Sequence, residues 1–131
     1  MFIYFIEEHH RFLPIVRPLF EEADRGRRQL VTSVLTLMEV LVAPYRAGDR
    51  ALARRYDVLL TRSRGVRLVD FTREHFRAAA QLRAVTAVKT PDALQLVSAM
   101  AAGCTTFVTN DRRLPPVTGL RVLLLDDFDE P

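Results

Sequence analysis

The chain has 131 residues, 49% of them hydrophobic, which is enough for one folded domain with its own core and excludes global disorder. No apolar run reaches the roughly 18 residues of a membrane-spanning helix, and the single Cys104 excludes an internal disulfide and indicates a reducing cytoplasm. The 19 basic and 16 acidic residues give a net charge of +3, and we expect one domain over residues 1–131, with the acid-rich residues 126–131 as a frayed tail.

Helical and strand patterns alternate along the chain. An apolar start at residues 2–12 predicts a short helix, and the amphipathic segment 13–27 predicts a second. Strands are expected at residues 29–33, 66–71, 104–109 and 120–125, the third of them buried on both faces. Further helices are expected at residues 36–45, 50–62, 72–85 and from Thr90 to Gly103. Asp49, Thr72 and Thr90 are the expected N-caps of the last three, and the helix at residues 50–62 is expected to turn its apolar face to the core. Strands that alternate with helices favour an α/β fold with a mostly parallel sheet and helices on both of its faces.

The segment from Lys89 to Leu114 contains two candidate site carboxylates. Asp92 falls in the first turn of a predicted helix, and Asp111 follows the predicted buried strand at residues 104–109. Ligands of open parallel sheets bind beyond the carboxyl ends of the strands, so we expect Asp92 and Asp111 to face the same edge. Each also has an ordinary structural interpretation, Asp92 as a partner of the helix dipole and Asp111 as a turn residue.

Glu39 is the third candidate, in the helix that follows the short strand at residues 29–33. Thr36-Leu-Met-Glu39 matches the capping-box pattern, which would give Glu39 a purely structural role. Its position just after a strand would instead bring it to the edge expected for Asp92 and Asp111, and the sequence leaves both alternatives open. Clustered carboxylates repel one another, and a hard divalent cation with oxygen ligands relieves that repulsion.

Three segments together resemble the PIN domain, specifically the VapC-like toxin ribonucleases of toxin–antitoxin pairs. They are TSVLTLMEV at residues 32–40, KTPDALQLVSAMAAGCTTFVTNDRRL at residues 89–114 and LRVLLLDD at residues 120–127. The resemblance implies a three-layer α/β sandwich, an endoribonuclease that uses Mg²⁺ or Mn²⁺, and inhibition by a VapB-like antitoxin. Glu39, Asp92 and Asp111 match the family's second, third and fourth acidic positions, and would hold the metal and serve catalysis.

The resemblance also carries expectations for binding partners. Thr109, Asn110 and Arg112 are expected to contact the RNA substrate. We further expect a homodimer and no membrane association. Lys89 is the only lysine, and arginine suits phosphate groups well, although an arginine bias from a GC-rich genome explains the composition at least as well.

The N-terminus departs from the family pattern. Members open with a strand that ends in Asp-x-Asn, whereas residues 2–6 resemble the helix that follows that strand. We expect that the start codon was assigned late and that Met1 is an internal residue; loss of the first strand is the alternative. The departure leaves a second function open, a catalytically impaired PIN-like domain that acts as a partner-binding module.

Overall fold

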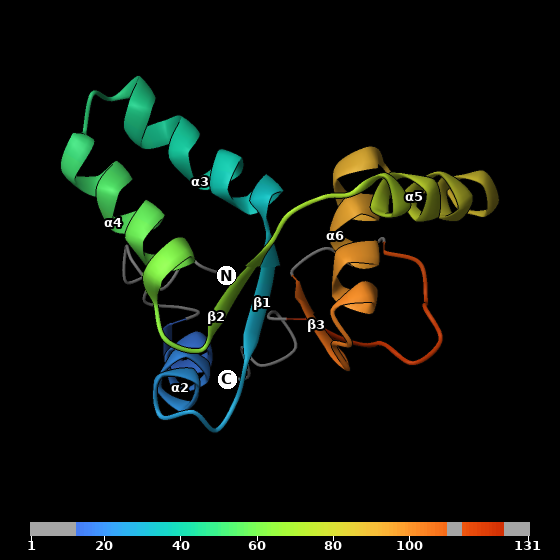
Figure 1. Cartoon of the computed structure of the whole chain (residues 1–131), viewed down its shortest axis with the longest axis horizontal. Coiled ribbons are helices and arrows are strands. Elements are labelled where there is room, and N and C mark those ends of the chain that lie inside the picture. Colours follow the sequence, from blue (N-terminus) through green and yellow to red (C-terminus); the bar gives the residue numbers. More distant parts are fainter. Residues whose placement is uncertain (1–12, 110–113, 125–131) are drawn as a thin grey trace, which may run out of the picture. The chain divides into compact units, whose positions relative to one another are not determined.

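The computed structural model describes residues 13–109 and 114–124. In chain order the helices are α2 (Leu13–Asp24), α3 (Val34–Arg46), α4 (Arg50–Arg62), α5 (Arg73–Val85) and α6 (Thr90–Ala101), and the strands are β1 (Leu30–Ser33), β2 (Val66–Val69), β3 (Thr106–Thr109) and β4 (Arg121–Leu124) (Figure 1). Helices and strands alternate, so the predicted α/β class is confirmed. The helix predicted at residues 2–12 and the tail predicted at residues 126–131 lie outside the described residues.

The chain divides after Leu68 into two compact units. In the first unit, α3 and α4 connect β1 to its parallel neighbour β2, and the backbone N–H of Leu30 donates to the carbonyl of Gly65 at 2.8 Å. The core of this unit is built by residues from α2, β1, α3 and α4, namely Phe20, Ala23, Leu30, Val40, Tyr56 and Leu60. The buried residues of α4 recur at helical spacing, so the face of α4 that packs into the core is the apolar face predicted from the sequence.

The second unit begins at Val69 and contains α5, α6, β3 and β4. β3 and β4 pair in parallel, with Thr106 opposite Arg121 and Thr109 opposite Leu124. The buried residues of this unit are Ala79, Val88, Ala93, Leu94, Leu96, Val97 and Leu120. Most of them come from α6, so that helix is the buried centre of the unit.

The strands are shorter and more exposed than predicted. The strand predicted at residues 104–109 was expected to be buried on both faces, but β3 starts at Thr106, which is exposed, and its other residues are half-buried. The described strands form two parallel pairs, so a single central sheet in a three-layer sandwich stays a prediction, as does the single domain. Within the described ranges, no helix has the length and apolar character needed to cross a bilayer.

Helix caps explain where several elements begin. Asp49 caps α4, because its Oδ1 accepts from the N–H of Leu52 at 3.0 Å, and Thr72 forms a capping box with His75 at the start of α5. Both starts agree with the sequence prediction. Thr90 was predicted to cap α6, but the N-cap is Lys89, which makes no side-chain cap hydrogen bond.

Ser33 connects β1 to α3, and its replacement tests that connection. The side chain is buried, and its Oγ accepts from the N–H of Leu35 at 3.2 Å. We expect Ser33→Ala to lower the free energy of unfolding by about 1 kcal/mol, the usual cost of a lost N-cap, as measured by urea denaturation. Ser63→Ala is the matched control, because Ser63 follows the C-terminus of α4; an equal loss in both variants would contradict the capping role.

Candidate carboxylate site

Asp92 lies in the first turn of α6 on a well-anchored segment. The helix starts after Lys89, with a proline in its first turn, and the N–H of Ala93 donates to the carbonyl of Lys89 at 2.9 Å. Ala93, Leu94, Leu96 and Val97 are buried directly after it, whereas Asp92 is half-buried. The buried face therefore fixes the position of the helix start while the carboxylate keeps contact with solvent.

Glu39 lies within α3, and of its two alternatives the capping box is the one that the structure excludes. The N-cap of α3 is Ser33, three residues before the predicted cap Thr36. Thr36 is inside the helix, and its Oγ1 accepts from the Oγ1 of Thr32 at 2.7 Å. Glu39 thus lies more than one turn beyond the helix start, where its side chain is exposed. A capping box therefore does not account for this glutamate, and its carboxylate is accessible to a cation or substrate.

The other predicted site residues fall mainly outside the described part of the chain. Asp111, Asn110 and Arg112 lie in residues 110–113, which the structure does not describe. Thr109 is the last residue of β3 and is half-buried. Glu39 and Asp92 are described in the first and second unit respectively. The convergence of Glu39, Asp92 and Asp111 at one site stays a prediction.

The donor chemistry of the candidates fits a hard divalent cation. Glu39 and Asp92 offer carboxylate oxygens, the ligand type that Mg²⁺ and Mn²⁺ prefer. Among the described residues, no three His, Cys, Asp or Glu side chains form a group that could hold a metal ion. His75 serves instead in the capping box of α5, where its Nδ1 accepts from the N–H of Thr72 at 2.9 Å.

Asp70 is a further carboxylate that the sequence prediction did not single out. The strand was predicted to continue to Phe71, but β2 ends at Val69 and Asp70 is exposed immediately after it. Phe71 packs edge-on against two rings of α5: its ring centroid lies 6.0 Å from that of His75 and 5.8 Å from that of Phe76. The predicted cap at Thr72 was the available signal, because a chain about to enter a helix must leave the strand first.

The comparisons with known proteins agree with this fold. A family profile for the PIN domain matches residues 1–120. Among solved structures, one described as a toxin–antitoxin complex from Klebsiella pneumoniae matches with a TM-score of 0.55 and 20% identity, over 67% of this chain and 68% of the other chain. No curated protein shows significant similarity to the sequence. The profile covers nearly the whole chain, and the chain therefore belongs to the PIN domain family.

Proposed function

We propose that this chain is a divalent-metal-dependent ribonuclease that acts in the cytoplasm as the toxin of a VapBC-type toxin–antitoxin pair. The observation that carries the proposal is the PIN-domain match over residues 1–120, because that range includes Glu39, Asp92 and Asp111. PIN domains are typically nucleases. The single domain and three-layer sandwich expected from the sequence are part of the same proposal.

Two structural observations support the roles of the carboxylates. Asp92 is half-buried at the start of a helix whose next turns are buried, an arrangement that suits a ligand held in a fixed position. Glu39 is exposed and is not part of a capping box, so the principal structural explanation for it is removed. The proposal therefore assigns these two residues, together with Asp111, to the site.

The proposed chemistry is phosphodiester hydrolysis. Bound Mg²⁺ or Mn²⁺ would supply a water of lowered pKa and positive charge near the scissile phosphate. Asp92 and Asp111 would hold the cation, and Glu39 would join them either as a direct ligand or through a bound water that it orients by accepting a hydrogen bond. Thr109, Asn110 and Arg112 contact the RNA strand beside Asp111.

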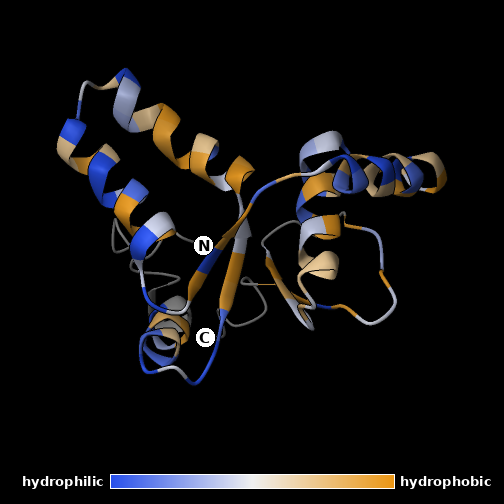
Figure 2. Cartoon of the chain, viewed as in Figure 1, coloured by the Kyte–Doolittle hydropathy of each residue, from blue (hydrophilic) through white to orange (hydrophobic). Residues whose placement is uncertain are grey.

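An antitoxin partner is part of the proposal, and the structural relative and an apolar stripe on α3 support it. The relative is described as a toxin–antitoxin complex. Met38, Val42 and Tyr45 recur at helical spacing with exposed fractions of 58%, 38% and 64%, and Figure 2 shows that α3 is largely hydrophobic. Such a stripe suits an apolar helix of a VapB-like antitoxin or of a second copy in a homodimer. It also favours the second candidate function, a partner-binding module with impaired catalysis.

RNA cleavage under controlled metal supply separates the two functions. The purified chain is incubated with end-labelled RNA in Mg²⁺, in EDTA, and in EDTA followed by excess Mn²⁺. We expect cleavage in Mg²⁺, none in EDTA and recovery in Mn²⁺, together with a rise in melting temperature on adding Mn²⁺, because an ion that binds the native state stabilises it. Intact RNA in all three conditions, with an unchanged melting temperature, would contradict the nuclease and favour the module.

A further inference from the structure

Two arginine-rich turns lie side by side in the first unit. One joins α2 to β1 and the other joins α4 to β2, so both lead into the starting ends of the β1–β2 pair. The hydrogen bond from the N–H of Leu30 to the carbonyl of Gly65 at 2.8 Å connects them directly. We refer to residues 25–29 and 62–67 as the arginine turns.

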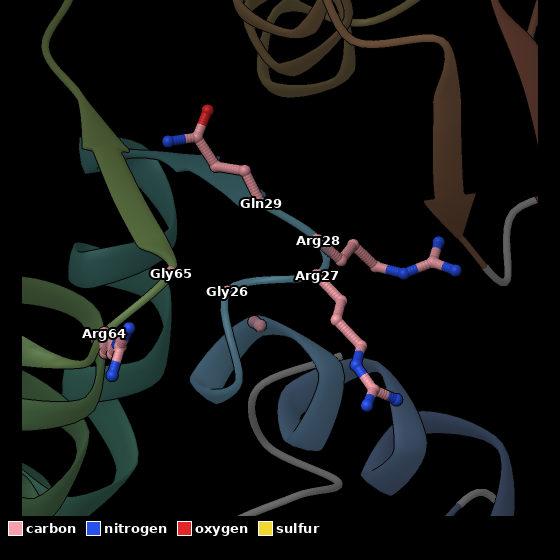
Figure 3. A pocket seen from close by; sticks show the side chains of 7 residues that line it. Gly26, Arg27, Arg28, Gln29, Arg64 and Gly65 are labelled. Carbon is pink, nitrogen blue, oxygen red and sulfur yellow. The ribbon is translucent and has the colours of Figure 1, made fainter.

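Together the arginine turns form a hollow in the protein surface. Its volume is about 330 Å³, and its lining includes Gly26, Arg27, Arg28, Gln29, Arg64 and Gly65 (Figure 3). The figure shows Arg64 on one side of the hollow and Arg27 and Arg28 on the other. The hollow is shallow and open to solvent, so it is a surface on which a phosphate group can lie rather than an enclosed ligand pocket.

The charge of the hollow is positive and only partly balanced. The two arginine turns contain six arginines, all exposed, and no Asp or Glu (Arg25, Arg27, Arg28, Arg62, Arg64 and Arg67). Figure 2 shows the turn before β1 as a continuous hydrophilic segment. Arg28 pairs with Glu22 at 2.7 Å, whereas Arg27 and Arg64 have no carboxylate partner within the described ranges. The positive charges of these arginines repel one another, and an anion between the turns would reduce that repulsion.

Two glycines fix the backbone beneath these arginines. Gly65 has a φ of +77°, and a Cβ at this position would lie 2.3 Å from the carbonyl oxygen of Ala23, so only glycine permits the close approach of the turn to α2. Gly26 has a φ of +76° and ends α2 in a Schellman motif, in which Arg27 N donates to the carbonyl of Glu22 at 2.9 Å. The arginines are thus carried by turns of defined geometry.

We infer that the arginine turns bind the phosphodiester backbone of single-stranded RNA; this inference rests on the proposed ribonuclease function. Arginine offers forked donors that match phosphate oxygens, and cations spread over two turns suit a chain of repeated phosphates better than a single small anion. The β1 strand leads from this hollow to α3, the helix that carries Glu39. Four strand residues span about 13 Å, so β1 separates the arginine turns from the start of the helix that carries Glu39.

RNA binding measured without cleavage tests this inference. Fluorescence anisotropy of a labelled 20-nucleotide single-stranded RNA in EDTA is recorded at several KCl concentrations for the wild type and for Arg27→Gln/Arg64→Gln. We expect the double variant to bind about tenfold more weakly near 100 mM salt. The slope of log affinity against log salt should fall in magnitude by about 1.4, which corresponds to two lost phosphate contacts.

Arg50→Gln/Arg54→Gln is the matched control, because it removes the same charge from exposed positions on α4. Its slope should equal that of the wild type, and thermal melts verify that both double variants are folded. Equal losses in the two double variants, or an unchanged slope in Arg27→Gln/Arg64→Gln, would overturn the inference. The inference would also be overturned if the Arg27→Gln/Arg64→Gln variant lost affinity for oligo-glutamate but kept wild-type affinity for RNA. Absence of RNA binding by the wild type would instead contradict the proposed function itself.

Discussion

Asp92→Asn should reduce Mg²⁺-dependent RNA cleavage at least ~100-fold, since even residues that only support a metal ligand cost about 10–100-fold when they are lost. The substitution keeps the size of the side chain and removes its charge. Because Asp92 lies in the first turn of α6, the free energy of unfolding should fall by less than about 1 kcal/mol, the value of a charge at a helix N-terminus. Cleavage of end-labelled RNA and urea denaturation measure the two quantities.

The matched control is Asp57→Asn on α4. Asp57 is exposed, and its Oδ1 accepts from Thr61 Oγ1 at 3.3 Å, an acceptor that asparagine retains. Its activity should remain within about twofold of the wild type. Cleavage by the Asp92→Asn preparation at the wild-type rate would show that the activity does not depend on this carboxylate, and would remove Asp92 from the site.

Gly65→Ala should have the largest effect on stability. Its φ of +77° costs an L-residue about 1–2 kcal/mol, and a Cβ would lie 2.3 Å from the carbonyl oxygen of Ala23, a backbone atom that cannot move aside without shifting α2. Displacement of packed atoms adds about 1–3 kcal/mol. We therefore expect a loss of about 2–5 kcal/mol in the free energy of unfolding, measured by urea denaturation followed by circular dichroism.

Gly48→Ala separates the two contributions. Gly48 has a φ of +67°, but no heavy atom beyond Gly48 and its two chain neighbours lies within 4 Å of the position that a Cβ would occupy. Alanine there should cost only the conformational term of about 1–2 kcal/mol. If the two glycine variants lose the same stability, the close contact between Gly65 and Ala23 is not a determinant of the fold.

Local sequence signals predicted the helices well. Asp49 and Arg62 bound α4 as expected, since an N-cap, an amphipathic face and a following glycine all act within a few residues. The start of α3 was predicted at residue 36, two residues late, because Ser33 and Thr36 can both serve as N-caps. Ser33 holds the cap because β1 ends there in extended backbone, a result of strand pairing rather than of local sequence.

The candidate site was only partly accessible from sequence. The first-turn position of Asp92 follows from local residues and is confirmed. The exposure of Asp70 was missed, because the end of β2 depends on pairing with β1 and on the packing of Phe71. The arginine turns were missed for a similar reason, since they are separated in the chain and come together through the Leu30–Gly65 hydrogen bond.

The most direct test of the account is whether the carboxylates share one cation. Mn²⁺ binding is measured by isothermal titration calorimetry for the wild type, Glu39→Gln, Asp92→Asn and Asp111→Asn, each verified to be folded. We predict one Mn²⁺ per chain in the wild type and a loss of at least about tenfold in affinity for that same ion in every variant. Wild-type affinity in Glu39→Gln together with lost binding in Asp92→Asn would contradict a site formed by all three carboxylates.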